Sequence, residues 1–369
     1  MLDFENFDFE DFDDGDFPKE PYPDYFYEWD EALSTTKNLR FLEEEELADI
    51  IEIYLGEGEV KKAKQTIGYA LKFHPDDEDL IYDILLLLND FELWNDLLAM
   101  AERYPDMPEA WVDGHKLTAL LHLGMEEYAF LFFRKIKCKY EKNAEQLSFI
   151  YQVMAESLQE VDLYSASLDV VREAIQLLGA HLDFYWLQLE AYLSTGTKKQ
   201  ALEMAAQIEQ VDPMTGETWH RLGIVYFGLE EIEKAIDAFE FAESLGMKTQ
   251  SNYLGLIAAY EKNENLLKAL EKAKDYIYLY PDSYIVYILA ANIYSELNYW
   301  KEALDYINIA LRMVPGMDTL YLYKSRFEVH LGEQKKAIAT LEEGIRQTQD
   351  KEGELRKELD KLHSEYPEK

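Results

Sequence analysis

From about Phe41 onward, apolar residues recur at spacings of three and four along the chain. Short polar turns interrupt this pattern after roughly every dozen residues, as in a series of helices that each bury one face. No stretch shows the strict alternation of a strand, and glycine-rich hairpin signals are missing. The pattern therefore predicts an all-α chain built from helix-turn-helix pairs.

Four columns of residues recur with a step of 34 positions. The chain carries an alanine column at Ala201, Ala235, Ala269, Ala303 and Ala337, a tyrosine column at Tyr192, Tyr226, Tyr260 and Tyr294, an aromatic column at Tyr151, Tyr185, Trp219, Tyr253, Tyr287 and Tyr321, and a proline column at Pro213, Pro281 and Pro315 with Met247 in the gap. A small side chain lets two helices approach closely, and a large ring fills the space between one pair and the next. Proline ends a helix because it lacks the backbone donor. The columns predict a stack of similar helix pairs.

The stretch "TWHRLGIVYFGLEEIEKAIDAFEFAESLG" resembles the tetratricopeptide repeat family. It keeps the pattern residues Trp219, Leu222, Gly223, Tyr226, Ala235, Phe239 and Ala242. The resemblance implies a right-handed superhelical solenoid of antiparallel helix pairs. Tyr54, Ala63, Ala70 and Pro75 repeat the spacing of Tyr294, Ala303, Ala310 and Pro315, which extends the resemblance upstream.

The chain is expected to have four parts. Residues 1–31 form an acidic-aromatic disordered tail, 32–43 a helix lead-in, 44–351 the solenoid, and 352–369 a C-terminal capping helix and tail. We expect nine repeats, starting near 44, 78, 108, 148, 182, 216, 250, 284 and 318.

Charge and composition restrict the partners. The 369 residues carry a net charge of −38, which repels phosphate backbones, so we expect no nucleic-acid partner. No apolar run approaches the length of roughly 20 residues that a membrane-spanning helix needs, so no membrane insertion is expected. A single cysteine, Cys138, excludes an internal disulfide and fits a reducing compartment. Together with the acidic N-terminus, which lacks the features of a secretory signal, this predicts a cytoplasmic protein.

Candidate chemistry is sparse. His115 and His122 lie seven residues apart on one helix face, but no histidines have the spacing of a helical zinc pair, and two ordinary half-buried histidines explain them. Phosphate loops, dinucleotide fingerprints and serine elbows are absent from the sequence. Cys138 lies between Lys137 and Lys139, which could make it reactive, although no partner base is evident. We expect a non-enzymatic protein with no cofactor and no metal, and a thiol-regulated or catalytic role for Cys138 is the less favoured alternative.

The resemblance implies a concave groove lined by the first helix of each pair. Three rows of positions on those helices would bind a hydrophobic peptide or an amphipathic helix, unless some of these side chains pack between helices instead. The expected protein-binding residues are Trp186, Glu190, Leu193, His220, Ile224, Phe227, Leu254, Ala258, Ile288, Asn292, Leu322 and Arg326. The resemblance therefore predicts a protein-protein interaction adaptor or scaffold.

Two charged segments suggest an alternative. A basic cluster at Arg134, Lys135, Lys137, Lys139 and Lys142 is either a docking patch for an acidic ligand or a solvated face with local charge balance. Residues 1–31 hold thirteen acidic residues against one lysine, together with ten aromatic rings. This tail solubilises the chain, binds a basic partner, or plugs the groove of its own chain. Its candidate motif is Phe4, Phe7, Phe9 and Phe12.

Overall fold

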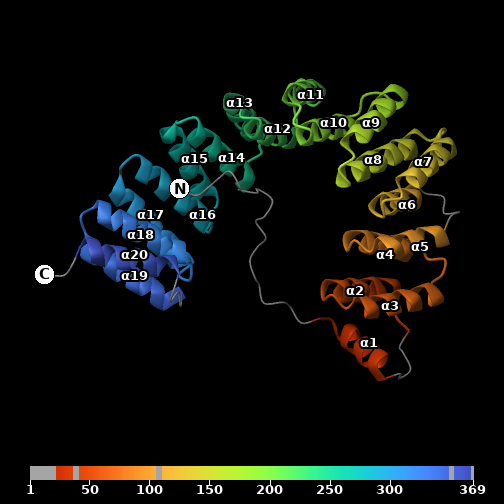
Figure 1. Cartoon of the computed structure of the whole chain (residues 1–369), viewed down its shortest axis with the longest axis horizontal. Helices are drawn as coiled ribbons and strands as arrows, with labels where there is room; N and C mark the ends of the chain where they lie inside the picture. Colours follow the sequence, from red (N-terminus) through yellow and green to blue (C-terminus); the bar gives the residue numbers. More distant parts are fainter. Residues whose placement is uncertain (1–21, 36–40, 105–109, 349–352, 367–369) are drawn as a thin grey trace. The chain divides into compact units, whose positions relative to one another are not determined.

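The computed structural model describes residues 22–35, 41–104, 110–348 and 353–366. All regular elements in these ranges are α-helices (Figure 1), so the all-α prediction is confirmed. The chain divides into two compact units, an N-terminal unit that ends at Ile208 and a C-terminal unit that begins at Glu209.

The helices of the N-terminal unit are α1 (Asp24–Thr35), α2 (Glu44–Gly56), α3 (Val60–Phe73), α4 (Glu78–Asp90), α5 (Trp94–Arg103), α6 (Ala110–His122), α7 (Glu126–Tyr140), α8 (Ala144–Glu160), α9 (Tyr164–Leu178), α10 (Leu182–Ser194) and most of α11 (Lys198–Val211). Those of the C-terminal unit are α12 (Gly216–Gly228), α13 (Ile232–Ser244), α14 (Gln250–Lys262), α15 (Leu266–Leu279), α16 (Tyr284–Glu296), α17 (Trp300–Met313), α18 (Asp318–His330), α19 (Gln334–Thr348) and α20 (Glu354–Glu365).

Each helix pair turns through a residue with a left-handed backbone. Positive φ angles occur at Gly58 (75°), Glu92 (55°) and Glu264 (57°), and at the matching position of the other pairs. Glycine adopts this conformation without a steric cost, whereas a residue with a Cβ is strained there. The turn keeps this left-handed conformation even where its residue is a glutamate, so the packing of the helix pair determines the shape of the turn.

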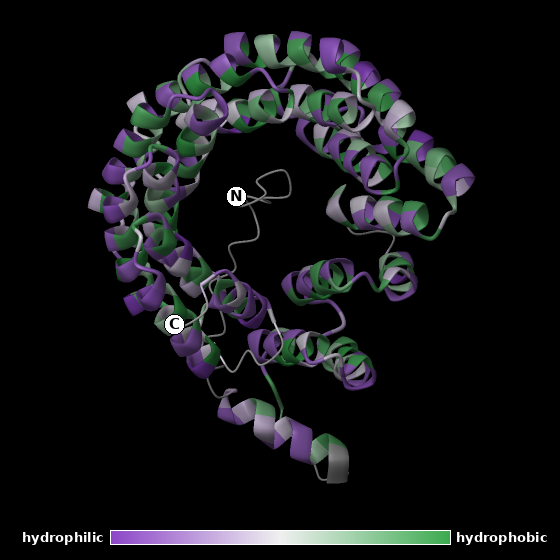
Figure 2. Ribbon diagram, turned by 60° about the vertical axis from the view of Figure 1, so that its left-hand side comes forward, coloured by the Kyte–Doolittle hydropathy of each residue, from purple (hydrophilic) through white to green (hydrophobic). Residues whose placement is uncertain are grey.

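The alanine column and part of the tyrosine column lie in the core. All five residues of the alanine column are fully buried, as close helix packing requires. Tyr226 and Tyr260 are each 2% exposed, and their hydroxyls donate hydrogen bonds to the carboxylates of Glu209 and Glu240. Hydrophobic and hydrophilic residues alternate along the helices (Figure 2), as expected of helices with one buried face.

Helix starts agree with the 34-residue step except in one region. First helices begin at Glu44, Glu78, Leu182 and Gly216, and then at Gln250, Tyr284 and Asp318. The repeat expected near 148 instead has its first helix starting at Ala144, because the Asn143 side chain caps it by accepting a hydrogen bond from the Gln146 backbone.

The boundary of the N-terminal tail was wrong. Residues 24–31, expected to be disordered, belong to α1, which continues to Thr35 within the expected helix lead-in at 32–43. Residues 41–43 are not helical, and α2 begins at Glu44, where the solenoid was expected to start. Phe26 and Trp29, three residues apart, share one face of α1 and are 8% and 2% exposed. Pro23 lies directly before the helix, where proline is tolerated.

Side-chain contacts hold α1 in place. The Trp29 indole donates a hydrogen bond to Thr66 Oγ1 at 3.1 Å, and Lys62 forms an ion pair with Asp30 at 2.7 Å. Tyr54 donates a hydrogen bond to the same aspartate at 2.9 Å. The aromatic residues of this segment therefore enter the core of the first repeat.

Helix α20 packs against the last pair. Its Leu355, Leu359 and Leu362 are buried in one cluster with Tyr321 of α18 and Leu341 of α19. The C-terminal capping helix therefore covers the last pair with an apolar face.

Candidate functional site

Half of the predicted groove residues are buried. Six of them are only 6–8% exposed: Trp186, His220, Leu254, Ala258, Ile288 and Leu322. Their side chains pack between helices, since the first helix of each repeat lies against its neighbours. These six side chains therefore expose little surface to a ligand, as in the alternative in which they pack between helices.

His220 shows what such a position does. Its Nδ1 lies 3.1 Å from Asn252 Oδ1 and its Nε2 lies 3.0 Å from Ser251 Oγ. Burial lowers the pKa of the imidazole, so the neutral ring donates to the amide oxygen and accepts from the serine hydroxyl. The residue links α12 to α14 within the core.

Other predicted residues reach the surface. In the N-terminal unit Glu190 is exposed and Leu193 is half-buried. In the C-terminal unit Ile224 and Arg326 are exposed, and Phe227 and Asn292 are half-buried. The accessible part of the predicted site is thus smaller and more polar than an apolar groove.

Glu261, on the same row of positions as Phe227, is the unusual member of this set. Its Oε2 is buried and has no hydrogen-bond partner among the described residues. Burial raises the pKa of this carboxyl group to about 7, and the like charge of Glu296 contributes to the rise. We call Ile224, Phe227, Glu261, Asn292 and Arg326 the first-helix surface.

The basic cluster on α7 is partly neutralised. Lys137 forms an ion pair with Glu173 at 2.6 Å, and Lys139 forms one with Asp113 at 2.8 Å. Local charge balance therefore accounts for these two lysines. The exposed cations that are left for a ligand are Arg134, Lys135 and Lys142.

Cys138 is exposed on α7. The two lysines that flank it, Lys137 and Lys139, point their ammonium groups at carboxylates of other helices. Their engagement weakens the argument for a reactive thiol. The candidate tail residues Phe4, Phe7, Phe9 and Phe12 lie outside the described residues.

One cluster has the residue types of a cation site. Single ligand atoms of Glu44, His74 and Asp77 lie within 4.8 Å of one another. Two of these groups already have structural roles, because Asp77 caps α4 by accepting a hydrogen bond from the Leu80 backbone and His74 Nε2 lies 3.1 Å from the Leu42 carbonyl. Exposed carboxylates in such arrangements are common without an ion, so the cluster carries no metal assignment.

The histidine pair on α6 serves the packing instead. His115 is buried enough that its pKa falls to about 4. His122 stacks on Trp94 with ring centroids 3.9 Å apart, and its Nε2 lies 2.9 Å from Glu160.

Comparison with known structures supports the fold. The C-terminal part of a repeat protein from Cytophaga hutchinsonii, described as containing tetratricopeptide repeats, superposes with a TM-score of 0.53. It is 15% identical and the match covers 65% of this chain and 96% of that one. The described chain thus has the fold of a tetratricopeptide repeat array.

Other solved structures match with lower scores. A tetratricopeptide repeat protein from Parabacteroides merdae gives a TM-score of 0.40 at 15% identity, covering 68% of this chain and 99% of that chain. PilF of Pseudomonas aeruginosa gives 0.43 at 12% identity, covering 60% and 99%. No protein-family model matches the sequence, and no curated protein does. Within the described ranges, none of the helices combines the length and apolar character that crossing a membrane requires.

Proposed function

We propose that this chain is a non-enzymatic cytoplasmic adaptor that holds a protein partner on its first-helix surface. Stacked helix pairs usually act by presenting long surfaces to other macromolecules. The first-helix surface combines apolar groups with charged ones, as protein interfaces do.

Glu261 is the observation that carries the proposal. A buried carboxylate oxygen without a hydrogen-bond donor is costly, and a second carboxylate beside it adds repulsion. A cationic side chain from a partner would relieve both effects. Ile224 and Phe227 would contact apolar groups of the same partner. The ligand that fits is an amphipathic helix or peptide that places a lysine or arginine next to apolar side chains.

Photocrosslinking in the native cell tests this proposal. A photoreactive phenylalanine analogue replaces Phe227 in one variant and Tyr278, an 86% exposed residue of α15, in the control. A crosslinked protein that appears from position 227 and is missing from position 278 supports the proposal. Equal crosslinking from the two positions would count against it.

The acidic N-terminal segment remains an alternative. It would bind a basic partner or occupy the first-helix surface of its own chain. Deleting residues 1–21 separates these hypotheses, because loss of the partner favours the segment, whereas retained or increased binding favours the surface. The deletion leaves Phe26 and Trp29 in place, so the first repeat keeps its core.

A further inference from the structure

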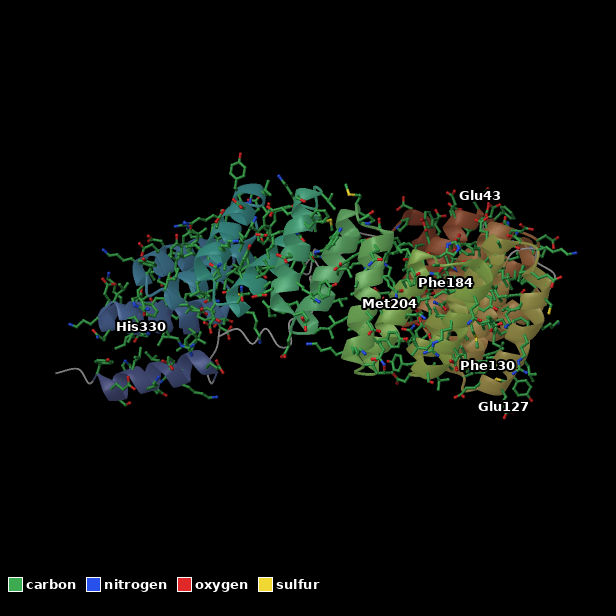
Figure 3. All side chains as sticks on the ribbon, turned by 90° about the horizontal axis from the view of Figure 1, so that it is seen from above. Glu43, Glu127, Phe130, Phe184, Met204 and His330 are labelled. Carbon is green, nitrogen blue, oxygen red and sulfur yellow. The ribbon has the colours of Figure 1, made fainter. Side chains whose placement is uncertain are left out.

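A cavity of about 410 Å³ lies between α9, α10 and α11 in the N-terminal unit. Four carboxamides and two phenols line it: Gln176, Gln188, Gln200, Gln207, Tyr185 and Tyr192. Met204 also lines it, and Figure 3 labels this residue on α11 and Phe184 on α10. The cavity has walls from three consecutive helices.

Gln188 explains why this space is open. It occupies the position that an apolar, fully buried residue takes in four other repeats, namely Met154, Leu222, Leu256 and Ala290. Gln188 is only 6% exposed, yet its side-chain amide makes no hydrogen bond within the described part of the chain. The amide lines the open cavity, where a ligand can supply its hydrogen bonds.

The tyrosines beside the cavity are accessible. Tyr185 and Tyr192 are half-buried, as are Trp219 and Tyr294 in the same two columns, whereas Tyr226, Tyr253 and Tyr260 are 2% exposed. Parts of the Tyr185 and Tyr192 rings are therefore available to a ligand in the cavity.

The same position opens a second cavity four repeats later. Lys324 stands 136 residues after Gln188 and lines a cavity of about 670 Å³ with Tyr321, the counterpart of Tyr185. In each unit, a polar residue at the position of Leu222 and Leu256 thus lines a cavity. Arg312 and Glu343 make the second cavity charged, so its chemistry differs from that of the first.

The chemistry of the first cavity selects a neutral ligand. Its two charged wall residues already face opposite charges, because Arg172 binds Asp169 at 2.8 Å and Glu203 lies 3.7 Å from Lys199. Each carboxamide offers both a donor and an acceptor, and each phenol does the same. The group that complements a carboxamide in this way is another carboxamide.

We infer that this cavity binds a glutamine or asparagine side chain of a partner peptide, with the Gln188 amide as its hydrogen-bonding partner. The inference rests on the proposed adaptor function and names the chemistry that a partner would present to the N-terminal unit. Tyr185 and Tyr192 would contact the aliphatic part of the inserted side chain. The site adds selectivity, since a site built for hydrogen bonds rejects ligands that cannot form them.

Calorimetry on the full chain tests the inference. The probes are acetyl-Ala-Gln-Gln-Ala-amide and its counterparts with two leucines or two glutamates in the centre. We expect the glutamine peptide to bind at least tenfold more tightly than the others. The variant Gln188→Leu should lose this preference while keeping or raising the thermal midpoint, because leucine is the residue that fits this position in α12 and α14. Gln210→Leu, an exposed change on α11, is the matched control and should bind like the wild type.

Several results would overturn the inference. These are equal affinity for the three peptides, no binding of the glutamine peptide at millimolar concentration, or unchanged binding by Gln188→Leu. The outcomes for the two proposals are separable. If position 227 crosslinks to a partner but Gln188→Leu does not change peptide binding, the adaptor function stands and the cavity inference fails. If the glutamine peptide binds but no crosslink forms, only the cavity inference stands.

Discussion

Phe239 on α13 is held between two glycines, and this arrangement predicts a substitution whose effect reverses sign. A Cβ added at Gly223 of α12 would lie 2.6 Å from the Phe239 ring, and one added at Gly255 of α14 would also lie 2.6 Å from it. Carbon atoms in contact normally lie about 3.5–4.0 Å apart. The ring is 1% exposed and cannot move away from one glycine without approaching the other.

Two effects compete in Gly223→Ala. Alanine gains about 1 kcal/mol over glycine inside a helix. Overpacking a core costs about 1–3 kcal/mol. Because the added Cβ would lie roughly 1 Å closer to the Phe239 ring than a normal contact, and the ring cannot move, we expect a cost near the upper end of this range. We therefore expect a net loss of about 1–2 kcal/mol. When Phe239→Ala has first removed the ring, the same Gly223→Ala should stabilise the fold by up to about 1 kcal/mol. The resulting coupling energy is about 2–3 kcal/mol.

Urea unfolding followed by circular dichroism measures these differences. Phe239→Ala alone should cost about 3–5 kcal/mol, and the fold accepts an alanine here because Ala273 holds the same position in the next repeat. Gly68→Ala in α3 is the control, since no atom lies within 4 Å of its added Cβ, and it should be stabilising. The reasoning is refuted if Gly223→Ala stabilises the wild type as Gly68→Ala does, or has the same effect in both backgrounds.

Three further predictions concern charged groups. The folded pKa of Glu261, about 7, exceeds its unfolded value, so the contribution of this group to stability is lost as the pH rises through 7. Glu261→Gln should therefore raise the free energy of unfolding at pH 8 by up to about 3 kcal/mol, and an unchanged pH profile in urea titrations would contradict this. The folded pKa of His115, about 4, lies below its unfolded value, so the contribution of the neutral imidazole to stability is complete above about pH 6.5 and is lost towards pH 4. His115→Gln should flatten this decline in stability, and an equally steep decline in the variant would show that His115 does not cause it. Lys139→Ala removes the ion pair of Asp113, which keeps its hydrogen bond from Tyr140, and should cost about 1 kcal/mol by thermal unfolding. The exposed Lys142→Ala should cost nothing measurable, and equal effects of the two changes would show that the ion pair is unimportant.

The sequence predicted the helix pairs well because their positions depend on spacing. The columns with a 34-residue step placed the starts of α12, α14 and α16 at the observed residues. Local sequence determines where these helices start, because the turns and the apolar helix faces repeat with the same spacing. Asn143 is a residue type that caps helices and indicates the observed start of α8, but the expected start near 148 followed the repeat spacing instead.

Burial could not be predicted in the same way. Spacing assigns Leu254 and Ile288 to the first helices, but how closely neighbouring helices pack decides whether these side chains are accessible. The acidic and aromatic composition of residues 1–31 suggested a disordered tail. Only the packing of α1 against the first repeat, with the hydrogen bond from Trp29 to Thr66, shows why Trp29 is buried. Gln188 was visible in the sequence as a polar residue at a position that is apolar in four other repeats. Its open cavity, however, depends on the placement of three helices.

The central claim is that the first-helix surface holds a protein partner. Its most direct test is the affinity of the purified crosslinked partner for the full chain, compared with the double variant Ile224→Ser, Phe227→Ser and the control Tyr278→Ser, with helicity checked for each. We predict at least a tenfold weaker dissociation constant for the double variant and an unchanged one for the control. Equal affinity of all three folded proteins would contradict the claim.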